Sequence, residues 1–175
     1  MSGYTIFALM LSAEEIRKKL KLQPHPEGGY FVETYRSSQK LHRKALSGGY
    51  PGDRAVSTAI YYLLTPKSFS AMHRLRGDEV FHFYLGDPVD LLQLYPDGTG
   101  KVTVLGSNLA AGMRPQTVVP GGVWQGLRLL RGGKYALLGA TVAPGFDFKD
   151  FELGDREELV EEYPQFADLI RHLTK

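Results

Sequence analysis

The feature that most constrains this chain is a long series of short segments rich in β-branched and aromatic residues, which fills the region from about residue 28 to residue 151. Turn-forming sequences such as Pro96-Asp97-Gly98 and Gly132-Gly133 separate these segments. Short strands at close spacing, without helical patterns between them, are typical of a β-sandwich or barrel rather than of βαβ units. We therefore predict an all-β fold. The predicted strands cover residues 29–35, 57–64, 80–85, 91–95, 101–105, 116–119, 123–130 and 135–142.

Helices are predicted only at the two ends of this region. Ser12 and Glu15 have the spacing of a capping box, and Pro24 stops the helix that follows them. Near the other end, Asp155 can cap a second helix, and apolar residues recur at helical spacing after Pro164. The polar stretch 37–54, which is interrupted by glycine and proline, is predicted to be a mobile loop that borders a site.

Length and composition restrict the class of protein. A chain of 175 residues suits a single domain, and the absence of cysteine excludes disulfides, zinc ribbons and thiol catalysis. A net charge of +2 argues against a nucleic-acid polymer as the partner. The apolar run from residue 4 to residue 11 is too short for a membrane span, which takes about 20 residues, and no basic segment precedes it as in a secretory signal. We expect a cytoplasmic protein that does not bind membranes.

Residues that could carry chemistry are concentrated between His73 and Gly86. His73, with either Glu79 or Asp78, could form the imidazole–carboxylate pair that proton transfer requires. If Glu79 faces the interior of a barrel, strand parity turns Phe81 and Phe83 inward and His82 outward, although a β-bulge could reverse this for His82.

The same block resembles the first motif of the cupin superfamily of small jelly rolls. His73, Glu79 and Gly86 fit that motif, but Leu75 stands where it has a second His, and Gln125 replaces the His of the second cupin motif. A narrower resemblance is to the Cupin 5 family of uncharacterised cupin-like proteins. The segments that carry it are 25–31, 33–36, 57–64, 78–84 and 142–148.

This resemblance implies a fold and an assembly. The fold is a double-stranded β-helix, the cupin jelly roll, similar to that of rhamnose-pathway sugar-nucleotide epimerases. It would occupy residues 1–175 as one cupin domain with a core of about 14–170, flanked by short N- and C-terminal helices. The resemblance also implies a homodimer that trades or adds edge strands.

Two kinds of site chemistry remain open. Cupins use three His and one Glu to bind a divalent metal, and only His73, Glu79 and the amide of Gln125 stand at those positions here. This set is a poor transition-metal site, which would hold a divalent metal weakly if it binds one. In epimerases of this shape, a His instead removes a proton next to a carbonyl and a Tyr returns one on the opposite face. That comparison makes His73 the base and leaves Tyr62 and Tyr84 as candidate acids.

The candidate site follows from these alternatives. The predicted catalytic residues are His73, Glu79, His82 and Tyr62. The predicted substrate-binding residues are Gln125, Arg36, Glu27, Phe81 and Phe83. Three functions remain open: an isomerase or epimerase acting on a polar, sugar-like or nucleotide-linked molecule, a metal-dependent dioxygenase or decarboxylase, and a module that binds or stores a small ligand without converting it.

Overall fold

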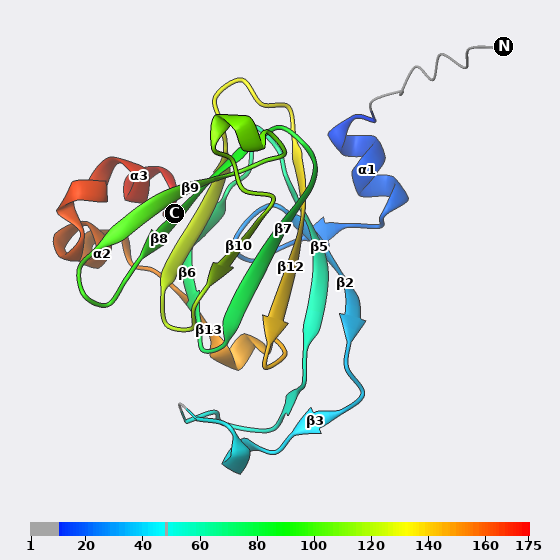
Figure 1. Ribbon diagram of the computed structural model, residues 1–175, viewed down its shortest axis with the longest axis vertical. Coiled ribbons are helices and arrows are strands. Elements are labelled where there is room, and N and C mark those ends of the chain that lie inside the picture. The colour runs from blue at the N-terminus through cyan, green and yellow to red at the C-terminus, as the bar shows by residue number, and fades with distance from the viewer. Residues whose placement is uncertain (1–10, 48) are drawn as a thin grey trace, which may run out of the picture.

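The computed structural model describes residues 11–47 and 49–175, and it contains two antiparallel β-sheets (Figure 1). The six-stranded sheet has the order β1-β2-β5-β12-β7-β10 and the five-stranded sheet the order β13-β6-β11-β8-β9. The first sheet consists of β1 (Gln23–Pro24), β2 (Tyr30–Arg36), β5 (Thr58–Leu64), β12 (Ala136–Ala143), β7 (Asp78–Gly86) and β10 (Gln116–Val119). The second consists of β13 (Phe151–Leu153), β6 (Ser70–Leu75), β11 (Trp124–Leu129), β8 (Val89–Leu94) and β9 (Gly100–Leu105). Non-consecutive neighbours in both sheets give the crossovers of a jelly roll.

The main core lies between the two sheets and follows the two-residue period of the strands. Tyr62 and Leu64 of β5 meet Leu138 of β12 and Phe81 of β7 on the inner face of the first sheet. The second sheet contributes the fully buried residues Val89, Leu91, Leu105 and Leu127. The prediction of an all-β jelly roll with short terminal helices is confirmed.

The helices cover the outer faces of the sheets. Helix α1 (Ala13–Lys19) begins at the predicted capping box and packs Ile16 with Leu63 and Leu137 on the outside of the six-stranded sheet. Helices α2 (Arg156–Glu162) and α3 (Ala167–His172) lie against the outside of the five-stranded sheet, where Met72 and Trp124 meet Leu159 and Ile170 (Figure 1). No helix within the described ranges is both long and apolar enough to cross a bilayer. Of the apolar run 4–11, only residue 11 is described.

Two parts of the chain differ from the sequence-based prediction. Strand β6, which carries His73, was not among the predicted strands. The stretch 37–54 was predicted to be a loop, but it contains a short ladder between β3 (Lys40–Leu41) and β4 (Arg54–Ala55) and a 3-10 turn at η1 (Arg43–Ala45). This segment extends away from the two sheets (Figure 1), and Arg54 anchors its end through two hydrogen bonds of 2.5 and 2.8 Å to Asp150.

Candidate active site

A cavity of about 320 Å³ opens at one end of the sandwich, bordered by the six-stranded sheet, β6 and the segment that follows β12. Its walls combine apolar and ionisable side chains. The apolar part includes Phe31, Ile60, Leu75, Val142, Phe146 and Phe148. The ionisable part is His25, Glu27, Glu33, Arg36, His73, Glu79 and Asp147. A pocket of this kind, with a few convergent polar groups in an apolar setting, is the usual form of a small-molecule site.

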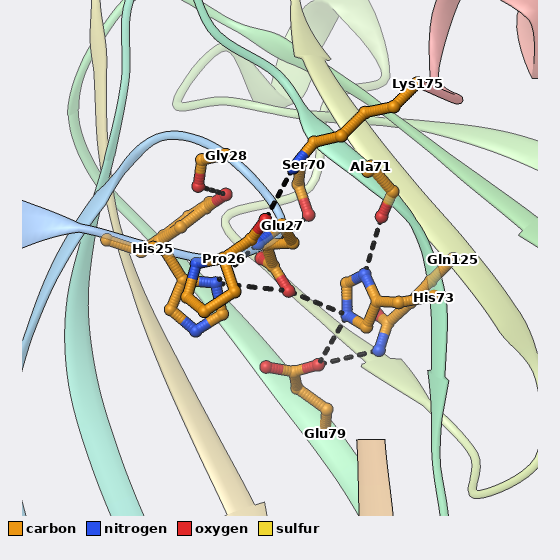
Figure 2. Close-up of polar contacts among 11 residues, drawn as sticks. His25, Pro26, Glu27, Gly28, Ser70, Ala71, His73, Glu79, Gln125 and Lys175 are labelled. Carbon is orange, nitrogen blue, oxygen red and sulfur yellow. Dashed lines mark hydrogen bonds and ion pairs between the residues drawn. The ribbon is translucent and has the colours of Figure 1, made fainter. Parts of the chain in front are cut away.

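His73 lies between two carboxylates at the inner end of this cavity (Figure 2). Its Nε2 is 3.4 Å from Glu27 Oε2 and 3.9 Å from Glu79 Oε2. All three residues are nearly inaccessible, with exposed fractions of 2% for His73, 8% for Glu27 and 7% for Glu79. The structure thus brings His73 and Glu79 together as the sequence predicted, and Glu27, which was predicted to bind substrate, lies beside them.

Backbone packing explains why Glu27 reaches this depth. The turn after β1 lies against β6, where the Ala71 amide donates to the Glu27 carbonyl at 3.0 Å. Gly28 has φ +118°, and a Cβ there would lie 2.1 Å from the Phe69 carbonyl oxygen, so only glycine allows this close approach. The Ser70 hydroxyl then donates to Glu27 Oε1 at 2.9 Å and fixes the carboxylate.

The hydrogen bonds of His73 determine which of its nitrogens can exchange a proton. Nδ1 is 2.7 Å from the Ala71 carbonyl oxygen, which can only accept, so Nδ1 carries a hydrogen. Nε2 therefore titrates, and it faces the carboxylates. Burial by itself lowers the pKa of His73, but the charges of Glu27 and Glu79 outweigh it and raise the pKa to about 9. At neutral pH, His73 is an imidazolium that can donate a proton from Nε2.

His25 is a site residue that the sequence analysis did not single out. Its Nδ1 is 3.6 Å from Glu27 Oε2 and accepts from the Glu27 amide at 3.3 Å. Burial lowers the pKa of His25 and thereby favours the neutral ring, although the charge of Glu27 opposes this effect. The ring packs edge-on against Phe31 at 4.5 Å between centroids. Its position in the 25–31 segment, two residues before Glu27, was the available signal.

Gln125 does not line the cavity, although it was predicted to bind substrate. It lies behind Glu79, where its Nε2 donates to Glu79 Oε2 at 2.7 Å, and its buried Oε1 has no hydrogen-bond partner (Figure 2). The amide thus orients Glu79 through its nitrogen. The proposed metal set of His73, Glu79 and Gln125 does not fit this arrangement, and no group of three or more His, Asp or Glu among residues 11–47 and 49–175 could hold a metal ion.

Four further predicted residues lie outside the cavity lining. His82 is on the outer face of β7, where its ring is within 3.2 Å of Gln116 and 3.3 Å of Thr141. The bulge that might have turned it inward comes later in the strand, beyond Phe83. Phe81 and Phe83 pack in the core between the sheets, and Tyr62 is buried beside them.

Arg36 lines the cavity, as expected, but it is already paired. It makes two hydrogen bonds of 2.6 and 3.0 Å to the carboxylate of Glu33, which raise the pKa of Arg36, and a third of 3.2 Å to the Phe146 carbonyl. The Phe146–Phe148 segment closes one side of the mouth, where the two rings pack edge-to-face at 5.0 Å.

Comparison with known proteins agrees with this architecture. Residues 14–154 match the model of the Cupin_5 family, described as Cupin superfamily (DUF985). The chain belongs to this family. A curated relative is the uncharacterised yeast protein YML079W from Saccharomyces cerevisiae, which is 35% identical over 147 residues, 79% of this chain and 73% of that protein.

Solved structures extend the comparison to three dimensions. A hypothetical protein from Leishmania major superposes with a TM-score of 0.86 at 34% identity, covering 94% of this chain and 99% of that one. Oxalate decarboxylase from Bacillus subtilis superposes with a TM-score of 0.51 at 13% identity, covering 86% of this chain and 36% of that one. The second likeness concerns the cupin fold alone.

Proposed function

We propose that this cupin catalyses proton transfer on a small polar carbonyl compound, as an isomerase. The observation that carries the proposal is the placement of the His73 Nε2 proton donor 3.9 Å from the Glu79 carboxylate in the wall of an accessible cavity. Proton transfer next to a carbonyl needs an acid and a base that are held close together and whose environments keep one group protonated and the other deprotonated.

The roles of the two carboxylates differ. Both oxygens of Glu27 are engaged, Oε1 with Ser70 and Oε2 with His73. Glu79 uses only Oε2 in the contacts drawn in Figure 2, which leaves Oε1 for a substrate. Glu79 is therefore the base, and Glu27 is a positioning residue that keeps His73 protonated.

The reaction then proceeds through an enol. Glu79 takes the proton from a carbon next to the substrate carbonyl, and His73 donates its Nε2 proton to the carbonyl oxygen. The carbon–hydrogen bond breaks and its electron pair forms the carbon–carbon double bond. In the second half, the neighbouring hydroxyl of the enediol returns a proton to His73, and Glu79 delivers its proton to the adjacent carbon. Protons and electrons balance, and the product is the isomeric carbonyl compound.

The geometry favours isomerisation over epimerisation. Inversion of a carbon centre needs an acid and a base on opposite faces of the substrate, and Tyr62 was the expected acid. Its hydroxyl instead donates to the Gly28 carbonyl at 2.8 Å, and burial raises the pKa of Tyr62 well above its ordinary value. His73 and Glu79 lie close together, which suits transfer of a proton between neighbouring atoms on one face.

The test is exchange of solvent deuterium into candidate substrates. A panel of small aldoses, ketoses and hydroxyketones, together with their amino-substituted analogues, is incubated with the protein in D₂O, and NMR records deuterium at the carbon next to the carbonyl. We expect exchange with the wild-type protein and a loss of about 100-fold or more in the His73→Asn and Glu79→Gln variants.

His82→Asn is the matched control, because His82 is on β7, the strand that carries Glu79, but lies outside the cavity. It should leave exchange unchanged. If no panel member exchanges, or if the His73→Asn variant catalyses exchange as fast as the wild type, the proposal that His73 transfers a proton is wrong. A compound that binds and is recovered without deuterium would identify the protein as a binding module.

A further inference from the structure

The charge of the cavity wall restricts the ligand more narrowly than the proton-transfer chemistry does. Four carboxylates line the cavity, those of Glu27, Glu33, Glu79 and Asp147, and the opposing cations are Arg36 and the imidazolium of His73. His25, the remaining ionisable group of the lining, is largely neutral because burial lowers its pKa. The lining therefore carries a surplus of negative charge.

The nearby basic groups are already paired and do not offset this surplus for a ligand. Arg36 is held in a two-bond contact with Glu33. Lys175, at the C-terminus, donates to the Pro26 carbonyl at 2.6 Å and is not part of the lining. A carboxylate or phosphate entering the cavity would lose its hydration without finding a free cation.

The apolar part of the wall provides the second, independent observation. Phe31, Phe146 and Phe148 present aromatic rings to the same cavity, and Phe148 is 55% exposed at its mouth. Aromatic faces attract ammonium groups through the ring quadrupole, and such rings beside carboxylates are how proteins recognise amines and quaternary ammonium compounds.

We propose that the ligand of this cavity is a small organic cation, an amine or a quaternary ammonium compound, held between the aromatic rings of the mouth and the carboxylates. Asp147 is the residue that we assign to the charge of the ligand. It lies between Phe146 and Phe148. Among the lining carboxylates it is the one that neither contacts His73 nor forms an ion pair with Arg36, although the charges of Arg36 and Arg54 act on it from a longer distance. The inference rests on the proposed function only in placing the ligand in the same cavity.

The experiment compares three probes of one shape. They are choline, the alcohol in which a tert-butyl group replaces the trimethylammonium group, and the carboxylic acid made by oxidising that alcohol. Affinity is measured by calorimetry or ligand-observed NMR at neutral pH. We expect choline to bind about tenfold more tightly than the alcohol, and the carboxylate to be the weakest of the three.

Variants locate the effect. Asp147→Asn keeps the oxygen that accepts from the Lys149 amide at 2.9 Å, so the turn is preserved while the charge is removed. It should lower the preference for choline over the alcohol by about threefold or more. Asp168→Asn is the control variant. It also removes one negative charge, but Asp168 is on α3, is 97% exposed and is not part of the cavity lining, so the preference for choline should stay unchanged.

Three results would overturn the inference: equal or tighter binding of the alcohol or the carboxylate, no binding of choline at any soluble concentration, or an unchanged preference in Asp147→Asn. Binding is measured without turnover. Choline selectivity without deuterium exchange would therefore refute the isomerase proposal alone, and exchange without choline selectivity would refute the cation proposal alone.

Discussion

Replacing Glu27 with glutamine should release the proton that His73 holds at neutral pH. The substitution keeps the size of the side chain and leaves an amide oxygen for the Ser70 hydroxyl, which donates to Glu27 Oε1 at 2.9 Å. It removes the negative charge that lies 3.4 Å from His73 Nε2. The variant thus changes the electrostatics of the site with little change in packing.

The size of the effect follows from that distance. Two unit charges 3.4 Å apart interact by about 5 kcal/mol at an effective dielectric constant of 20, which would move a pKa by about 3.5. The Glu79 charge, 3.9 Å away, stays in the variant and continues to favour the protonated ring. Burial lowers the pKa of His73, so once Glu27 is neutral the pKa should fall from about 9 to below about 7.

The assay is a titration of the His73 ring by two-dimensional NMR in both proteins. Glu33→Gln is the control, because Glu33 lines the same cavity but is paired with Arg36, and it should move the pKa of His73 little. A His73 pKa that stays near 9 in Glu27→Gln, or that falls equally in Glu33→Gln, would refute the assignment of Glu27 as the group that keeps His73 protonated.

Four further predictions concern stability and assembly. Folding raises the pKa of His73 from 6.5 to about 9, so its protonation adds about 3 kcal/mol to the free energy of unfolding. This stabilisation is complete below pH 6.5 and is lost as the pH rises through 9, and urea titrations across that range can measure it. Asp150→Asn leaves the buried Arg54 without its ionic partner and should cost about 3 kcal/mol in the same assay, whereas Glu152→Gln, at an exposed ion pair, should cost less than about 1 kcal/mol. Gly28→Ala should destabilise by about 3 kcal/mol or more, and an unchanged midpoint would refute the close approach described for that turn. The homodimer expected from the family resemblance predicts twice the 19.5 kDa chain mass in light scattering, and the monomer mass would refute it.

The strands that the sequence predicted are those whose side chains follow a two-residue pattern or are dense in β-branched and aromatic residues. Strand β6 lacks both signals. Its Ser-Ala-Met-His-Arg-Leu sequence has no β-branched residue, and residues 70–73 are all buried, because one face packs in the sandwich and the other under α2 and α3. A strand covered on both faces shows no alternation, so its sequence does not distinguish it from other buried segments.

The candidate site was predictable where spacing decides it. His73 and Glu79 were paired from their positions. Strand parity indicated that His82 faces outward, but His82 was still predicted to be catalytic, and the structure places it outside the cavity lining. The depth of Glu27 and the role of His25 were not predictable, since both depend on how the turn at Gly28 packs against the Phe69 backbone. Gln125 was expected to face the substrate, but it contacts Glu79 instead, and this contact follows from the register of β11 against β6.

The measurement that tests the central claim most directly is the protonation state of His73 in the unmodified protein, read from the ¹⁵N shifts of its two ring nitrogens at neutral pH. The account predicts that both nitrogens carry hydrogen, Nδ1 bonded to the Ala71 carbonyl and Nε2 facing the two carboxylates. A neutral ring with hydrogen on Nδ1 alone would contradict it, because His73 would then have no Nε2 proton to donate to a substrate.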